Sequence, residues 1–174
     1  FAGLVRSQTG LAVLHAAKID DISTARHAIA EGKLDLVGMT RAHIADPHIV
    51  RKLIAGKADE IRPCVGATYC LDRIYEAGEA LCIHNAATSR EQTMPHEIEP
   101  AKVRRRVVIV GAGPGGLEAA RVAGERGHDV VVLEAMPFAG GQIMLAVRNK
   151  RRRDLIGIVD WRLAELRRLG VELR

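Results

Sequence analysis

Short aliphatic runs and longer helical patterns alternate in the first third of the chain. Residues 11–15 (LAVLH) form a run suited to a buried strand. Asp20 or Asp21 follows and precedes a helical pattern that stops at Gly32. An aspartate at this place is a favoured helix cap, because its carboxylate accepts hydrogen bonds from the first free N–H groups. The pattern predicts a strand followed by a helix.

The same order of elements is repeated directly afterwards. Residues 34–39 (LDLVGM) are typical of a second strand, and Asp46 with Pro47 is typical of a helix start. Gly56 is the expected end of that helix. Two consecutive strand–helix units favour a parallel sheet or a barrel.

The last third of the chain predicts a second α/β region. Residues 106–110 and 130–134 are expected to be strands, with a helix over 114–126 between them. Asp154 is the expected cap of a further helix that ends at Gly170, and residues 171–174 are expected to begin a third strand. The apolar face of that helix is expected to hold Leu155, Val159, Leu163 and Leu166.

Residues 57–103 show no regular period and contain all three cysteines of the chain. Pro95 and Pro100 flank a polar stretch that we interpret as a linker between domains. The expected organisation is therefore three regions, at 1–62, 63–103 and 104–174.

Composition changes this picture in three ways. Aromatic residues make up 3% of the chain, so the core is expected to be aliphatic, as in α/β proteins. The net charge of +5 gathers in the basic runs 104–106 and 148–153, but no aromatic residues interleave with them, so a solvated surface is favoured over nucleic-acid binding. No apolar run reaches the roughly 18 residues of a membrane span, and no signal peptide opens the chain, so we expect a cytoplasmic location without membrane contact.

A glycine-rich loop carries the clearest chemical signal. Residues 111–116 (GAGPGG) match the G-x-G-x-x-G fingerprint of dinucleotide binding, between a predicted strand and a predicted helix. Gly111 permits the tight turn, Gly113 lets the backbone approach a pyrophosphate, and Gly116 lets the helix pack closely on the sheet. The free N–H groups of the helix start, Gly115 among them, then face the phosphates.

Glu134 ends the following strand, 23 residues after Gly111. Its carboxylate can accept hydrogen bonds from both hydroxyls of an adenosine ribose. The alternative is a structural glycine-rich turn with a solvated glutamate. Spacing alone does not separate FAD from NAD.

Cationic residues follow both predicted strands of the first region. Lys18 comes after the first strand, and Thr40 and Arg41 come after the second, beside Gly38. In a strand–helix barrel, ligands gather at the C-terminal ends of strands, and the last two units often supply a phosphate site. The residues alone leave open whether Lys18 and Arg41 hold a phosphate or are solvated.

The three cysteines raise the question of a metal site. Cys64, Cys70 and Cys82 are an odd number, which argues against a disulfide framework. A [4Fe–4S] cluster needs four thiolates, and closely spaced cysteines with a distant one are typical of such clusters. Zinc fits less well, because no second pair of ligands is evident. Packed, metal-free cysteines are the alternative.

The chain resembles an internal piece of the NADH:flavin oxidoreductases of the trimethylamine dehydrogenase and 2,4-dienoyl-CoA reductase type. The run 34–47 (LDLVGMTRAHIADP) is similar to the eighth strand and helix of old yellow enzyme-type barrels. That resemblance implies that Arg41 contacts an FMN phosphate with Thr40 beside it, and that Lys18 replaces the arginine usual in the preceding strand. Residues 140–142 (GGQ) resemble the FAD-binding segment of the family, so Gln142 is a further candidate and FAD is favoured over NAD.

The cysteine segment carries the resemblance further, with one departure. Cys64, Cys70 and Cys82 match three of the four cluster ligands of trimethylamine dehydrogenase-like enzymes, but Ala67 stands where the second cysteine would be. Alanine cannot ligate iron. The resemblance therefore implies either a cluster with three cysteine ligands, as [3Fe–4S] or as [4Fe–4S] with another ligand such as His84, or a branch that has lost the cluster.

Taken together, the resemblance implies an α/β chain built from the C-terminal end of a (β/α)8 barrel, the cysteine-bearing segment, and the first half of a Rossmann-like FAD/NAD-binding domain. It implies a cytoplasmic FMN- and FAD-dependent oxidoreductase that oxidises a methylated amine or amino acid, such as dimethylglycine or N-methylproline. NAD(P)H-dependent reduction of an enoate or a dienoyl thioester is the alternative, and an electron-transfer or nucleotide-binding module is a second one.

The same resemblance sets expectations for what lies outside this chain. Hydride transfer occurs at FMN, so the catalytic acid or base is expected on earlier barrel strands. An electron carrier such as an electron-transfer flavoprotein, and a homo-oligomer, are the expected partners. Phe1 at the start and the strand-like 171–174 at the end are expected of a fragment.

Overall fold

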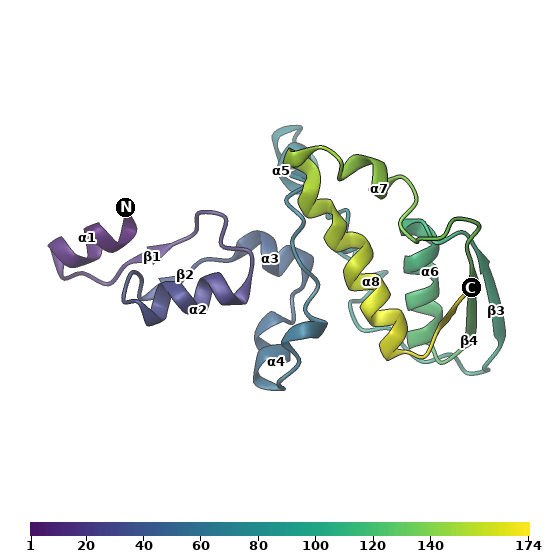
Figure 1. Cartoon of the computed structure of the whole chain (residues 1–174). Coiled ribbons are helices and arrows are strands. Elements are labelled where there is room, and N and C mark those ends of the chain that lie inside the picture. Colours follow the sequence, from purple (N-terminus) through teal and green to yellow (C-terminus); the bar gives the residue numbers. More distant parts are fainter. The chain divides into compact units, whose positions relative to one another are not determined.

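The computed structural model describes all residues from 1 to 174. The chain divides into two compact units, Phe1–Cys64 and Val65–Arg174, which lie toward the purple and the yellow ends of the colour scale in Figure 1. No helix of the chain is both long and apolar enough to cross a bilayer.

The first unit contains a two-stranded parallel sheet. Its strands β1 (Leu14–His15) and β2 (Leu36–Val37) pair Leu14 with Leu36 and His15 with Val37. Both strands are shorter than the predicted runs 11–15 and 34–39. The helices of this unit are α1 (Ala2–Thr9), α2 (Ile22–Ala30), α3 (Thr40–Ala45) and α4 (Ile49–Ile54), followed by the 3-10 helix η1 (Ala58–Glu60).

The helix between the two strands begins and ends as predicted. Asp21 is the N-cap of α2, and its side chain accepts a hydrogen bond from the backbone N–H of Thr24 at 2.8 Å. The chain leaves the helix through Gly32, which adopts a φ of +62°. Helix α1 has no counterpart in the sequence-based prediction.

The predicted helix start at Asp46 is wrong. Asp46 instead ends α3, and α4 begins at Ile49 with His48 as its N-cap. The buried carboxylate of Asp46 accepts hydrogen bonds from the ammonium of Lys52 at 2.6 Å and from the backbone N–H of Arg62 at 2.8 Å. Burial raises the pKa of Asp46, but these hydrogen bonds outweigh burial and leave it below its usual value.

The second unit is built on a three-stranded parallel sheet in the order β3–β4–β5. Strands β3 (Arg106–Val110) and β4 (Asp129–Leu133) pair along five residues, and β5 (Glu172–Leu173) pairs with the end of β4. This order confirms the predicted parallel α/β character of the region.

Two helices cover one face of this sheet and lie side by side in Figure 1. They are α6 (Pro114–Glu125), which connects β3 to β4, and α8 (Gly157–Arg168), which precedes β5. The core between helices and sheet is aliphatic, as the composition predicts: Ala112, Leu117, Ala120, Val130, Val132, Val159 and Leu166.

Three shorter helices complete the second unit. They are α5 (Tyr69–Tyr75), α7 (Ile143–Ala146) and the 3-10 helix η2 (Lys150–Ile156). The predicted cap at Asp154 is wrong, because Asp154 lies inside η2 and α8 begins at Gly157. Neither α5 nor α7 was predicted, because both are too short to repeat an apolar position over several turns.

Candidate functional site

The glycine-rich loop joins the C-terminal end of β3 to helix α6. Gly111 turns the chain with a φ of +95°, and its N–H donates to the carbonyl of Leu133 on the neighbouring strand at 2.7 Å. Gly113 is the N-cap of α6, and Pro114 occupies its first turn. The first N–H groups of the helix therefore lie at the C-terminal edge of the sheet, where they lack partners within the helix.

Two of the four glycines of the loop are required by the fold itself, each for a different reason. Gly111 needs its positive φ, which disfavours other residues. A Cβ at Gly116 would overlap the carbonyl oxygen of Gly111, so glycine there permits the helix to approach the turn.

Gly113 and Gly115 have no such internal requirement. Gly113 has a φ of −70° and a ψ of 175°, values open to any residue, and a Cβ at either position would meet no atom within 4 Å. The open space beside these two glycines matches what a pyrophosphate at a helix N-terminus needs.

Glu134 directly follows strand β4 and contacts the glycine-rich loop through its carboxylate. Its carboxylate accepts hydrogen bonds from the N–H of Ala112 at 2.6 Å and of Met136 at 2.9 Å. The hydrogen bonds from Met136 and Ala112 lower the pKa of Glu134, so it is ionised at neutral pH. Each carboxylate oxygen has a second lone pair, which leaves capacity to accept from ribose hydroxyls.

A second pair of glycines, Gly140 and Gly141, lies against the glycine-rich loop. The N–H of Gly140 donates to the carbonyl of Ala112 at 2.8 Å, and Gly140 has a φ of +116°. A Cβ at Gly141 would lie 3.2 Å from the Cα of Gly113. The segment that carries Gln142, the N-cap of α7, is thereby fixed against the candidate phosphate site.

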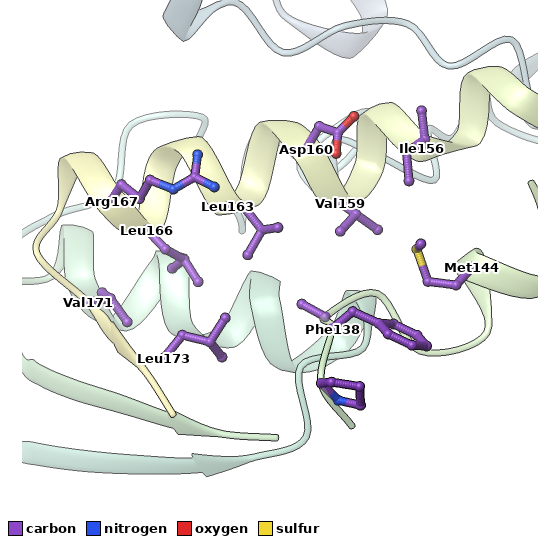
Figure 2. Close-up of a pocket in the computed structure, with 12 residues that line it drawn as sticks. Phe138, Met144, Ile156, Val159, Asp160, Leu163, Leu166, Arg167, Val171 and Leu173 are labelled. Atoms are coloured by element: carbon purple, nitrogen blue, oxygen red, sulfur yellow. The ribbon is translucent and has the colours of Figure 1, made fainter. Parts of the chain in front are cut away.

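Figure 2 shows a pocket of about 410 Å³ between α8, β5 and the segment after Glu134. Its walls are mainly apolar, with Phe138, Met144 and Leu163 among them, and Asp160 and Arg167 are its charged residues. The pocket does not contain the loop 111–116. It therefore supplies apolar surface, whereas the predicted polar groups for a nucleotide lie at the loop.

The predicted phosphate ligands of the first unit follow the two paired strands. Lys18 comes three residues after β1, with a positive φ of 53°, and Thr40 and Arg41 form the first turn of α3 after β2. Parallel pairing places both strand ends at the same edge of the sheet. A Cβ at Gly38 would lie 2.6 Å from the Cβ of Ala16, so close approach of the two strand ends accounts for this glycine.

The three cysteines of the chain are its predicted metal ligands. Cys64, Cys70 and Cys82 are half-buried and form no disulfide. Nowhere do three or more His, Cys, Asp or Glu side chains group so that they could hold a metal ion. The Sγ of Cys82 accepts a hydrogen bond from the N–H of His84 at 3.4 Å, and the His84 ring packs edge-on against Trp161. The residues present thus do not fit a four-thiolate cluster, and the predicted ligation stays a prediction.

Sequence-based reasoning missed a cluster of buried charges between α6 and α8. Arg121 and Arg162 are buried, and both are ion-paired with Glu118. A signal was present, because Arg162 lies at the helical spacing of Val159 and Leu166, on the face predicted to be apolar. A charged residue at such a position indicates a buried ion pair.

Known proteins confirm the α/β assignment and the resemblance. Residues 109–159 match the NAD(P)-binding Rossmann-like domain family. The chain is 63% identical over 171 residues to a probable N-methylproline demethylase of Rhizobium meliloti (strain 1021), and 58% identical over 173 residues to a multifunctional alkene reductase/demethylase of Caballeronia cordobensis. These alignments cover 98% and 99% of the chain and 25% of each relative.

The backbone of this chain is also similar to that of a solved structure. The 6-hydroxypseudooxynicotine amine oxidase of Pseudomonas geniculata N1 superposes with a TM-score of 0.94 at 29% identity, over 99% of this chain and 27% of that one. Over nearly its whole length the chain is therefore similar to these demethylases and to this amine oxidase. It spans about a quarter of the length of the relatives it matches.

The open space at Gly113 generates a direct prediction. Gly113→Ala should leave the melting temperature of the intact protein within about 2 °C of wild type, because the new methyl group meets no atom of the chain. It should nevertheless lower the affinity for ADP by about tenfold or more, since the methyl group occupies the space for the pyrophosphate. Calorimetric titration checks this. Gly116→Ala is the matched control, and it should lose both stability and binding, whereas unchanged ADP binding by Gly113→Ala would contradict the assignment.

Proposed function

We propose that this chain supplies the adenine-dinucleotide site and one side of the FMN phosphate site of a flavin-dependent oxidoreductase. The observation that carries the proposal is the open space at Gly113 and Gly115, next to the free N–H groups of α6. FAD is the favoured dinucleotide, because residues 140–142 resemble the segment that follows this loop in FAD-binding domains of the family. In the structure this segment is hydrogen-bonded to the loop. NAD(P)H, or a permanently bound ADP, is the alternative.

In this proposal the loop and Glu134 divide the recognition of the nucleotide. The N–H groups at the start of α6 donate hydrogen bonds to the pyrophosphate, and the positive end of the helix dipole favours its charge. The carboxylate of Glu134, already held by the N–H of Ala112, accepts hydrogen bonds from the ribose and disfavours a 2′-phosphate.

The first unit is proposed to be the end of a (β/α)8 barrel that binds FMN. Lys18 and Arg41 follow adjacent parallel strands, which is where the last two units of such a barrel hold a phosphate. Bound FMN would supply hydride transfer with the substrate. The residues of this chain would hold its phosphate, while the acid or base that acts on the substrate is expected in the preceding barrel strands.

The proposed substrate of the intact protein is a small N-methylated amine or amino acid. The names of the demethylase of Rhizobium meliloti and of the amine oxidase with the matching structure support this class. Oxidation of such an amine transfers a hydride from its N-methyl group and yields an iminium ion, which water hydrolyses to formaldehyde and the demethylated amine. Alkene reduction is the second candidate, because the relative of Caballeronia cordobensis carries both activities in its name.

No step is assigned to an iron–sulfur cluster. Ala67 removes one of the four ligands that the family pattern would supply, and the structure groups no three candidate ligands. An electron carrier as partner and a cytoplasmic homo-oligomer are part of the proposal for the intact protein.

Arg41 tests the FMN site. Arg41→Ala in the intact protein should reduce FMN affinity by about tenfold to a hundredfold, because a charge-assisted contact to the phosphate contributes roughly 1.5–3 kcal/mol. The FMN content of the purified protein, measured after denaturation, checks this. Arg26→Ala is the matched control, since Arg26 is exposed on α2. Equal FMN content in the two variants would contradict the assignment.

The substrate class is tested by anaerobic bleaching of the flavin in the intact protein. N-methylproline or dimethylglycine should bleach it and release formaldehyde, and an artificial electron acceptor should restore the oxidised spectrum. The competing reductase predicts a different outcome, in which NADH or NADPH bleaches the flavin and an enoate reoxidises it. Bleaching by nicotinamide nucleotides alone would therefore reject the amine assignment.

A further inference from the structure

The cluster of buried charges joins the cysteine segment to the nucleotide-binding helix within the second unit. Arg162, with a side chain 4% exposed, uses its guanidinium in three directions. Its Nε donates to Glu118 Oε2 at 2.8 Å, its Nη1 to the carbonyl of Ile158 at 3.0 Å, and its Nη2 to the carbonyl of His84 at 3.3 Å. An unpaired buried cation would strongly destabilise the fold, so all three contacts favour this one position of the guanidinium.

The contact to His84 fixes the turn that carries Cys82. His84 is 1% exposed, and its ring packs against Trp161 with centroids 5.3 Å apart and an interplanar angle of 87°. Arg162 and Arg121 lie over the same Trp161 ring, at 5.9 and 5.4 Å. The N–H of His84 in turn donates to the Sγ of Cys82. The cysteine is thus two residues from a carbonyl that Arg162 holds.

The contact of Arg162 with Glu118 connects the cluster of buried charges to helix α6. Glu118 lies in the second turn of α6, next to Leu117, whose N–H donates to the carbonyl of Gly113 at 2.9 Å. Ordering of the loop by a bound pyrophosphate would therefore act on Glu118 within the same rigid helix. Burial lowers the pKa of Arg162 and Glu118 opposes that shift, so the guanidinium stays charged at neutral pH.

We propose that Arg162 is a positioning residue that couples the segment 82–88 to the nucleotide-binding loop, so that occupation of the loop orders the turn carrying Cys82. The planar fork of arginine is needed, because one guanidinium must serve Glu118 and the His84 carbonyl together. This inference rests on the proposed nucleotide site. In this proposal the buried ion pair between Arg162 and Glu118 makes the order of the turn carrying Cys82 depend on nucleotide binding.

The test is hydrogen–deuterium exchange of the intact protein, freed of its bound nucleotide, with ADP as the probe. In the wild type, ADP should slow amide exchange in peptide 110–118, and also in peptide 82–88 by on the order of fivefold. In Arg162→Met, protection of 110–118 should remain while protection of 82–88 is lost.

Two further variants separate positioning from stability. Arg162→Lys keeps the attraction to Glu118 but not the fork, so its melting temperature should lie closer to wild type than that of Arg162→Met, and peptide 82–88 should still be uncoupled. Arg168→Met is the matched control, because Arg168 pairs with Glu125 and Glu165 at the far end of the cluster. It should lower the melting temperature and keep the coupling.

The outcomes distinguish the two levels of the proposal. ADP protection of 110–118 without protection of 82–88 in the wild type overturns the coupling and leaves the nucleotide site intact. Coupling that survives in both Arg162 variants also overturns it. Failure of ADP to protect 110–118 in the wild type rejects the nucleotide site itself, and the inference with it.

Discussion

The close approach of helix α6 to the turn after β3 is the constraint on which the second unit depends. Gly116 permits it, because any side chain at that position would overlap the carbonyl oxygen of Gly111. The approach brings Leu117 and Ala120 into the aliphatic core and directs the first N–H groups of the helix toward the edge of the sheet. The same packing thus provides both the stability of the fold and the position of the proposed phosphate site.

The surroundings of the loop reinforce that constraint. The carboxylate of Glu134, directly after the neighbouring strand, accepts a hydrogen bond from the N–H of Ala112. The N–H of Gly140, in the following segment, donates to the carbonyl of Ala112. These two hydrogen bonds hold Ala112 on both sides, and a bound pyrophosphate would order the rest of the loop further. The buried ion pairs of Arg162 extend this rigid region to the turn carrying Cys82.

Local signals predicted the second unit well. Strands β3 and β4 and helix α6 follow from aliphatic runs and from glycines with defined backbone roles. One error lies where a polar side chain acts through distant contacts. Asp46 resembles a helix cap in sequence, but it is satisfied by Lys52 and by the backbone of Arg62, a partner that no local pattern reveals. The Arg162 contacts to Glu118 and His84 likewise span 44 and 78 residues.

The central claim is that the glycine-rich loop holds an adenine dinucleotide in a flavin-dependent oxidoreductase. The most direct measurement is chromatographic identification of the nucleotides that the intact, purified protein releases on denaturation. The account predicts FMN together with one adenine-containing nucleotide per chain, with FAD favoured. Release of FMN alone, from protein that also fails to bind added FAD, ADP or NAD, would contradict it.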